Sequence, residues 1–385
     1  MVREDIYKNV FLIRNVSRFN YGGGETYQLK LAKKLAEYGY TPIIITNSEK
    51  LIKVAKQKGF GVLIPPFSRR QNWSGWRNAL LPLYFIFQKK LTNWYRTEIR
   101  KYRPVAINIQ SRDDMLAGTM AAKELGLKVL WTDHADFKNW VLWNVNVKYK
   151  NTIGKKIIKL SKDVEKVIFV SEEIKEETAR MIAPQKLYNS VVIENGVDDE
   201  LEKNIDVKTK KTSFVFVGRV VKEKGVEELI KAFTMVLAKY PDAKLNIYGD
   251  GEIKRFQKLS NNNVRFYGKT NNASRVLAEN EVFILPSHHE GLSLSLLEAA
   301  MMGKKIIASD VDGNPEVVVD GKTGLLVPAK NVQKLAEAMI WMLEHKKEAE
   351  VMSRNARKRY EKYFNFEKIF EEKMLPLYNG EKEKK

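Results

Sequence analysis

The chain has 385 residues, of which 44% are hydrophobic and 10% aromatic, enough for two domains that each bury a core. It has no cysteine, which excludes disulfides, thiolate metal sites and cysteine nucleophiles. The first ten residues lack the apolar stretch of a secretory signal, and the longest apolar run, at 79–87, contains a proline and is too short to span a bilayer. We therefore expect a globular, cytoplasmic protein that does not cross a membrane.

The net charge of +20 is distributed unevenly. Between residues 50 and 110, 13 Lys or Arg residues stand against a single Glu, which gives this segment a net charge of +12. Such an excess indicates an anionic partner, although a solvated lysine-rich surface would have the same composition.

Short apolar runs rich in β-branched residues alternate with longer amphipathic stretches, a pattern that predicts parallel βαβ units. In the first half the expected strands are 10–14, 42–46, 62–64, 105–109, 129–132, 167–170 and 191–193. In the second half they are 214–217, 245–248, 264–267, 282–285, 305–308 and 325–327, with helices such as 225–239 and 332–345 between them. The polar stretch between the two series is typical of a linker.

The expected fold class is therefore α/β, with two doubly wound Rossmann-like domains facing a central cleft and ligands at the carboxyl ends of the strands. We expect domains at 1–197 and 213–362, joined by the linker 198–212. The remaining segment, 363–385, contains an amphipathic helix at 367–378 and is expected to pack back on the first domain.

The strongest motif follows the expected strand 282–285. Glu290 and Glu298 lie eight residues apart and flank a glycine and the start of a helix. The amides and dipole of a helix N-terminus bind anions, so carboxylates on either side of that point can hold hydroxyls around a phosphate, as a nucleotide sugar requires. Alternatively, Ser295 and Glu298 have the spacing of a capping box, in which Glu298 would only satisfy a backbone donor.

Basic residues follow the first strand of the second half. That strand leads into Gly218 and Arg219, and Lys224 precedes the next helix. The planar fork of arginine and the point charge of lysine suit a diphosphate leaving group. Basic residues after a strand are usually solvated, but these lie at a strand's carboxyl end in the same domain as Glu290.

The first half offers two further candidates. Gly22, Gly23 and Gly24 open a helix after the first strand, where glycines let the backbone approach a phosphate, or simply form a turn. They do not match the G-x-G-x-x-G pattern of dinucleotide sites. His134 ends the fifth strand, and a histidine that faces a cleft from this position is a candidate site residue.

Two clusters look like metal sites but are not interpreted as such. His288, His289 and Glu290 are adjacent, so on a strand end they point to opposite faces. Asp310 and Asp312 lie in a loop before Gly313, where their pattern is typical of a turn. We therefore expect no metal.

Taken together, these motifs resemble the retaining glycosyltransferases of the B-fold type, family four, and the resemblance covers nearly the whole chain. The segments that carry it are 22–25, 194–198, 216–219 with 223–225, 286–299, 313–316 and 321–328.

The resemblance implies roles for individual residues. Arg219 and Lys224 would hold the diphosphate, Glu298 the ribose and Glu290 the transferred sugar. His134 would lie beside that sugar. The remaining substrate-binding positions are Gly23 and Gly24, Asn195, Gly218, and Gly291, Leu292 and Ser293, of which Gly23 and the last three would bind phosphate through their amides. Leu292 stands where the family usually has Phe, which leaves the choice of sugar open.

The resemblance also implies a metal-independent, hexosyltransferase-like enzyme with no cofactor besides its donor substrate. Its first domain would bind the acceptor. Residues 66–103 of that domain interleave aromatic and basic side chains, which suits an anionic membrane surface, or else a helix packing its apolar side on its own sheet. We therefore expect a peripheral enzyme on the inner face of the cell membrane that glycosylates a lipid-linked or cell-envelope acceptor.

Two other functions compete with this one. A sugar-nucleotide epimerase on a similar fold would consume the donor without an acceptor. A nucleic-acid-binding protein would account for the charge, but the sequence has no recognisable nucleic-acid motif, and no nucleic acid is expected as a partner.

Overall fold

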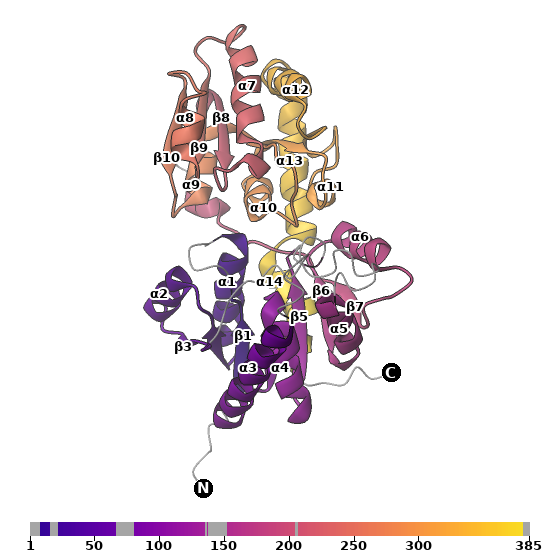
Figure 1. Cartoon of the computed structure of the whole chain (residues 1–385). Coiled ribbons are helices and arrows are strands. Elements are labelled where there is room, and N and C mark those ends of the chain that lie inside the picture. The colour runs from indigo at the N-terminus through magenta and orange to yellow at the C-terminus, as the bar shows by residue number, and fades with distance from the viewer. Residues whose placement is uncertain are drawn as a thin grey trace. The chain divides into compact units, whose positions relative to one another are not determined.

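The structure is a computed structural model that describes residues 8–15, 22–66, 81–134, 137, 152–204 and 207–379. The chain forms two compact units. The first contains Met1–Ile193 and Phe370–Lys385, and the second contains Glu194–Ile369. Each unit is an α/β domain built on one parallel sheet (Figure 1).

The sheet of the first unit has seven strands in the order β3-β2-β1-β4-β5-β6-β7. They are β1 (Lys8–Ile13), β2 (Tyr40–Ile45), β3 (Gly61–Leu63), β4 (Ala106–Ile109), β5 (Lys128–Asp133), β6 (Lys166–Phe169) and β7 (Ser190–Val192). Each lies within two residues of a strand expected from the sequence. The apolar runs mark the five inner strands well because a parallel strand covered on both faces buries nearly all its side chains, whereas the edge strands β3 and β7 contain no fully buried residue.

Among the described residues, six α-helices connect these strands. They are α1 (Gly23–Glu37), α2 (Glu49–Gln57), α3 (Leu81–Tyr102), α4 (Arg112–Glu124), α5 (Thr152–Leu160) and α6 (Glu172–Ile182). Serine side chains cap two of them: the Ser48 hydroxyl at the start of α2 accepts a hydrogen bond from the Leu51 amide. The Ser171 hydroxyl at the start of α6 accepts one from the Ile174 amide.

The end of the chain belongs to the first unit from Phe370 onward, whereas the helix α14 before it still belongs to the second unit. α14 (Phe366–Ile369), a π-helical turn (Phe370–Met374) and α15 (Leu375–Tyr378) follow one another, so the helix expected at 367–378 is not continuous. Pro376 lies in α15 and has no amide hydrogen, which accounts for the break in the hydrogen-bond pattern just before it. The buried Tyr378 hydroxyl accepts from Asn108 Nδ2 at 2.8 Å.

The sheet of the second unit has six strands in the order β10-β9-β8-β11-β12-β13. They are β8 (Lys210–Val217), β9 (Lys244–Tyr248), β10 (Val264–Gly268), β11 (Asn280–Leu285), β12 (Lys305–Ser309) and β13 (Leu325–Val327). β8 begins four residues before the expected strand, because Lys210 pairs with Asn280 of β11 and the Thr212 amide donates to Glu281. Part of the stretch 198–212 therefore belongs to the sheet.

The helices of this unit are α7 (Val226–Leu237), α8 (Ile253–Gln257), α9 (Ala273–Ala278), α10 (Leu294–Met301), α11 (Asn314–Val317), α12 (Val332–Glu344) and α13 (Lys346–Tyr363). The end of α13 lies against the first residues of the unit. The Val197 amide donates to Phe364 O at 3.1 Å, and the Tyr360 hydroxyl donates to Val197 O at 2.9 Å.

Both sheets reverse their strand order beside the first strand. The reversal lies between β1 and β4 in the first unit and between β8 and β11 in the second. At such a point the loops after the two neighbouring strands leave toward opposite faces of the sheet, which opens a crevice at the carboxyl ends where ligands bind. The two confirmed doubly wound sheets therefore each contain one favoured position for a site.

Candidate functional site

In the second unit, the loops after β8 and β11 bring Lys224 and Glu290 together. The Lys224 ammonium forms an ion pair with Glu290 Oε1, which also accepts from Ser287 Oγ at 2.7 Å. The two charged side chains are only 17% and 7% exposed, so water screens their attraction less than that of a surface pair. Two residues that the sequence predicts for the donor site thus lie in direct contact at the switch point.

The loop at 310–313 holds the backbone at Glu290. The Glu290 amide donates to Asp312 Oδ2 at 2.7 Å, and His289 Nδ1 lies 3.6 Å from the same oxygen. A Cβ on Gly313 would lie 2.0 Å from Gly291 O, so the two loops pack backbone against backbone. The Asp310 to Asp312 segment is a turn, as expected, but Asp312 also positions the Glu290 loop, a role that the sequence did not reveal.

Glycines allow similar close contacts elsewhere around β8. Gly225 has a φ of +68°, and a Cβ there would lie 1.9 Å from Pro286 O. A Cβ on Gly249, after β9, would lie 1.7 Å from Gly218 O. These glycines let the loops after β8, β9 and β11 approach one another.

The N-terminus of α10 lies next to Glu290 in the chain. Ser293 is the N-cap residue, and among the described residues no side chain caps the helix. Ser295 is already the second helical residue, so the capping-box alternative for Glu298 is wrong. Asn195 Nδ2 donates to Leu292 O at 3.1 Å and so supports the segment Gly291 to Ser293 that leads into this helix. An uncapped helix N-terminus is a favourable place for an anion.

The other predicted residues of this unit surround the same strand ends. Arg219 directly follows Gly218 at the end of β8 and is exposed. Glu298 is half-buried on α10. His288 does not join a metal cluster, since its Nε2 lies 3.1 Å from Glu228 on α7. Within the described ranges, no group of three or more His, Asp or Glu residues could hold a metal ion.

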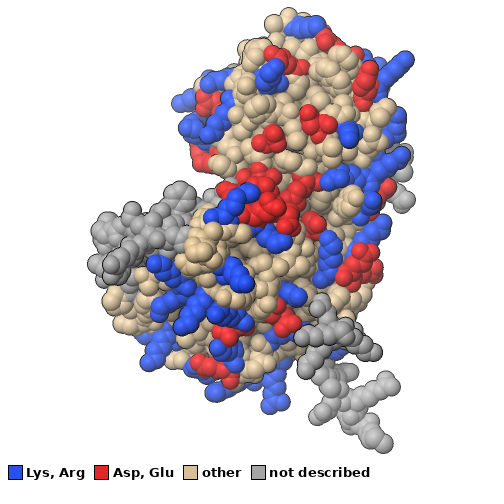
Figure 2. Space-filling view, turned by 90° about the vertical axis from the view of Figure 1, so that its right-hand side faces the viewer, with Lys and Arg blue, Asp and Glu red and all other residues tan. Residues whose placement is uncertain are grey.

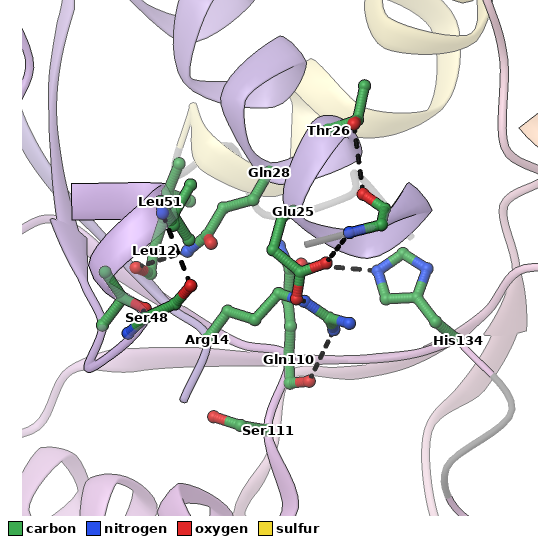
Figure 3. Close-up of polar contacts among 12 residues, drawn as sticks. Leu12, Arg14, Glu25, Thr26, Gln28, Ser48, Leu51, Gln110, Ser111 and His134 are labelled. Carbon is green, nitrogen blue, oxygen red and sulfur yellow. Dashed lines mark hydrogen bonds and ion pairs between the residues drawn. The ribbon is translucent and has the colours of Figure 1, made fainter. Parts of the chain in front are cut away.

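In the first unit, a buried ion pair fixes the start of α1 (Figure 3). Arg14 Nε donates to Glu25 Oε1 at 2.8 Å, and Glu25 Oε2 accepts the Gly22 amide at 2.7 Å. Arg14 Nη1 also reaches Gln110 O at 3.3 Å, so this one guanidinium links the ends of β1 and β4 to α1. A Cβ on Gly24 would lie 2.2 Å from Arg14 Nη2, so a larger residue there would require the guanidinium to move. Gly23 is the first residue of α1 and is exposed.

His134 lies at the end of β5 and turns its ring toward the side chain of Gln110 (Figure 3). His134 Nε2 is 3.3 Å from Gln110 Oε1, and the ring packs edge-on against Tyr27 with centroids 5.0 Å apart. Burial, and then the charge of Arg14, lower the pKa of His134 to about 3. The ring is therefore neutral near pH 7.

A second polar group lies beside this one. The carboxylate of Asp114 accepts from Asn15 Nδ2 at 2.9 Å, from Ser111 Oγ at 2.6 Å and from the Tyr95 hydroxyl at 2.6 Å. Burial raises the pKa of Asp114, while these hydrogen bonds act in the opposite direction. The group ties α3 and α4 to the end of β1.

Sequence reasoning missed Arg14, Gln110 and Asp312. Arg14 and Gln110 share a signal that could have identified them, because each directly follows a buried apolar strand and lies at the reversal of strand order. Asp312 has no such signal, since its contact with Glu290 depends on the packing of two loops that are 22 residues apart.

Part of the basic and aromatic segment 66–103 lies outside the described residues, namely 67–80. The rest forms α3. Leu91, Tyr95 and Ile99 of this helix are buried, while Leu83 and Ile86 are 45% and 55% exposed. One side of α3 therefore packs inward, as expected for a helix that covers its own sheet. The helix also exposes apolar side chains, as a membrane-binding helix would. No helix in the described part of the chain is long and apolar enough to cross a membrane.

Comparisons with known proteins agree with these motifs. The family model for glycosyl transferases group 1 matches residues 197–359, and the model for glycosyltransferase family 4 matches residues 21–201. An uncharacterised glycosyltransferase of Methanocaldococcus jannaschii is 32% identical over 62% of this chain and 62% of its own length. The poly(glycerol-phosphate) alpha-glucosyltransferase of Bacillus subtilis is 29% identical over 52% of this chain but only 31% of its own length.

Solved structures show the same fold. A glycosyltransferase from Rickettsia africae has a TM-score of 0.75 at 20% identity, over 97% of this chain and 98% of its own. An Anabaena protein, solved in complex with UDP and glucose, has a TM-score of 0.73 at 17% identity, over 97% of this chain and 100% of its own. The fold is that of the B-type glycosyltransferases. With the two family models together matching residues 21–359, the chain belongs to the group 1 glycosyltransferases, family four.

Proposed function

We propose that this chain transfers a sugar from a nucleotide-diphosphate sugar to an acceptor hydroxyl, with retention of configuration and without a metal. The observation that carries the proposal is the Lys224–Glu290 ion pair at the β8/β11 switch point, next to the uncapped N-terminus of α10. The relatives of this chain, and the Anabaena structure in complex with UDP and glucose, support a nucleotide sugar as donor.

The ion pair suggests how the donor binds. In the free protein Lys224 pairs with Glu290. A bound diphosphate offers Lys224 a more highly charged partner, and Glu290 is then released to accept a hydrogen bond from a sugar hydroxyl. Arg219, exposed at the end of β8, adds a second positive group for the diphosphate.

The same groups stabilise the leaving nucleotide. As the bond between sugar and diphosphate breaks, negative charge builds on the phosphate and positive charge on the sugar. Lys224, Arg219 and the amides at Gly291 to Ser293 neutralise the phosphate. The acceptor attacks the face that the leaving group vacates, and a phosphate oxygen takes its proton. Glu298 holds the ribose.

A nucleotide-release assay tests this proposal. The protein is incubated in EDTA with a panel of uridine, guanosine and adenosine diphosphate sugars, and release of the nucleoside diphosphate is measured. We expect release from one donor class, lost in Arg219→Ala and Glu290→Ala. If the sugar is converted to an isomer while still bound to the nucleotide, the epimerase alternative is correct instead.

The acceptor is proposed to be a lipid-linked or cell-envelope glycan reached at an anionic membrane surface. The name of the Bacillus subtilis relative, a poly(glycerol-phosphate) alpha-glucosyltransferase, supports an envelope polymer. In the first unit α3 exposes Leu83, Ile86 and Lys89, and Lys156 of α5 lies over the Phe85 ring at 4.1 Å. On the face drawn in Figure 2, Lys and Arg side chains are scattered over this unit, among other residues and some Asp and Glu. Apolar side chains rimmed by lysines bind anionic bilayers.

Sedimentation with liposomes tests the membrane surface. We expect the protein to pellet with phosphatidylglycerol vesicles at low salt and to be released at high salt. The double variant Leu83→Ser, Ile86→Ser should pellet far less. Met235→Ser is the matched control, because Met235 is also an exposed apolar residue, at 39%, but lies on α7 of the second unit. Equal pelleting of both variants would show that α3 is not the membrane contact.

A further inference from the structure

Two adjacent lysines are buried where β12 begins, at the end of the sheet opposite the proposed donor site. Lys305 is the first residue of β12 and Lys304 directly precedes it, and they are 8% and 9% exposed. Lys305 forms an ion pair with Glu281 at 2.7 Å. The ammonium of Lys304 has no hydrogen-bond or ion-pair partner among the described residues. Lysines are almost never buried without a partner, so Lys304 is an exception that requires an explanation.

The two acidic residues whose charges act on Lys304 do not pair with it. Glu281 uses both carboxylate oxygens elsewhere, since Oε1 holds Lys305 and Oε2 accepts the Thr212 amide at 2.8 Å. Glu350 of α13 is exposed and acts on Lys304 only through its charge. The Lys304 ammonium therefore bears the cost of burial without a compensating contact.

Burial changes the charge state of Lys304. It lowers the pKa of Lys304 to about 8; the charge of Lys305 acts in the same direction, and the charges of Glu281 and Glu350 act against it. At pH 8 about half of the Lys304 side chains then carry a neutral amine, whereas the neutral fraction of an ordinary exposed lysine, with a pKa of about 10.4, is about 0.4%. A neutral amine is a nucleophile, and an ammonium is not.

We infer that Lys304 is a modification site that takes a small acyl group from an acyl phosphate, independently of the proposed glycosyl transfer. The Nζ lone pair attacks the acyl carbon and forms a nitrogen–carbon bond, and the bond from that carbon to the phosphate oxygen breaks. Phosphate leaves with the electron pair, and one proton of the amine passes to water. The donor has to be small because the side chain is only 9% exposed.

The two lysines differ in what acylation does to their surroundings. An acylated Lys304 is an uncharged amide, so the modification removes the cost of a buried, unpaired charge. Acylation of Lys305 would break its ion pair and leave the Glu281 carboxylate without its cation. The modification is therefore favoured at Lys304 and opposed at its equally buried neighbour.

Competitive labelling of the whole chain with acetyl phosphate tests the inference. The protein is treated at limited conversion between about pH 6 and pH 9, and acetylation at each lysine is measured by mass spectrometry. At pH 8 we expect Lys304 to be acetylated at least tenfold faster than Lys305 and than Lys347, an exposed residue of α13. The rate at Lys304 should level off above about pH 8, and its preference should disappear in denaturing urea.

Three results would overturn the inference. Equal acetylation of Lys304 and Lys305 would show that the missing ion pair gives Lys304 no special reactivity. Acetylation of Lys347 as fast as that of Lys304 would show that burial confers no advantage. The third result concerns variants and needs no reagent. Lys304→Met should have an unchanged or higher Tm, because it removes an unpaired buried charge, whereas Lys305→Met should have a lower Tm. An equal loss of Tm in both would show that the Lys304 ammonium is stabilised by a partner.

Discussion

Lys224 and Glu290 are the residues on which the proposed donor site depends most. We expect Lys224→Met to lower turnover of the nucleotide sugar about 100-fold or more, because it removes positive charge at the leaving diphosphate. Lys305→Met is a matched control: Lys305 pairs with Glu281 at 2.7 Å, with the two side chains 10% and 15% exposed, but at the opposite, N-terminal end of β12. Both variants should lose stability in urea unfolding, and only the Lys224 variant should lose turnover. Equal losses of turnover would contradict the role given to Lys224.

His134 makes stability depend on pH in a defined window. Its pKa is about 3 in the folded chain against 6.5 for the free group. Between these values the unfolded chain binds a proton that the folded chain does not, so the unfolding free energy falls as pH falls from 6.5 toward 3 and is unaffected above 6.5. At pH 5 the lowered pKa of His134 should make the free energy of unfolding about 2 kcal/mol smaller than at pH 7. Urea unfolding of wild type and His134→Gln at both pH values tests this. From pH 7 to pH 5 the variant should lose less of its free energy of unfolding than wild type does. A constant difference between the two proteins would contradict the lowered pKa.

At the residue scale, the sequence reveals the groups that belong to local motifs. Lys224 and Glu290 were predicted because each lies at a fixed distance from a strand end and a helix start. Asp312 and Gln110 were not, because their importance depends on contacts between loops far apart in the chain. Spacing within one segment cannot indicate which oxygen another loop will place beside it.

At the scale of the elements, the loop between β8 and α7 is tightly constrained by its packing against the loop after β11. Gly225→Ala would place a Cβ 1.9 Å from Pro286 O in addition to the strain of a φ of +68°. Gly321 has nearly the same φ, +67°, and nothing within 4 Å of a Cβ. We expect Gly321→Ala to cost about 1–2 kcal/mol from backbone strain alone. Gly225→Ala should cost clearly more, or prevent folding, and urea unfolding measures both. If both substitutions lower the free energy of unfolding by similar amounts, the β8–α7 loop and the loop after β11, which contains Pro286, can move apart freely.

Strands were predicted better than helices for a physical reason. A buried parallel strand is a short run of apolar residues, and that signal is complete within the run itself. Helix ends depend on capping, which several side chains can provide. Ser295 had the right spacing for a capping box, yet α10 starts with Ser293 as its N-cap. The break before α15 likewise is not marked by any apolar run, since it follows from the missing amide hydrogen of Pro376.

At the scale of the whole molecule, the last residues of the chain belong to the first unit. A chain that ends at Ile369 would lose Tyr378 and its bond to Asn108, but it would keep the contacts of Val197 with Tyr360 and Phe364. We expect amide hydrogen exchange to rise in β1, β2 and β4 while it stays unchanged in β8 and β11. Faster exchange in both sheets would show that the two units do not respond separately.

The most direct test of the account is whether the second unit binds a nucleoside diphosphate. Calorimetric titration of the whole chain in EDTA with UDP, GDP and ADP, repeated on Arg219→Ala, measures this. We expect wild type to bind one of the three selectively and the variant to bind it at least tenfold more weakly, since one of the two cations that hold the diphosphate is lost. Binding that is unchanged in Arg219→Ala, or no binding of any of the three, would contradict the placement of the donor at the β8/β11 switch point.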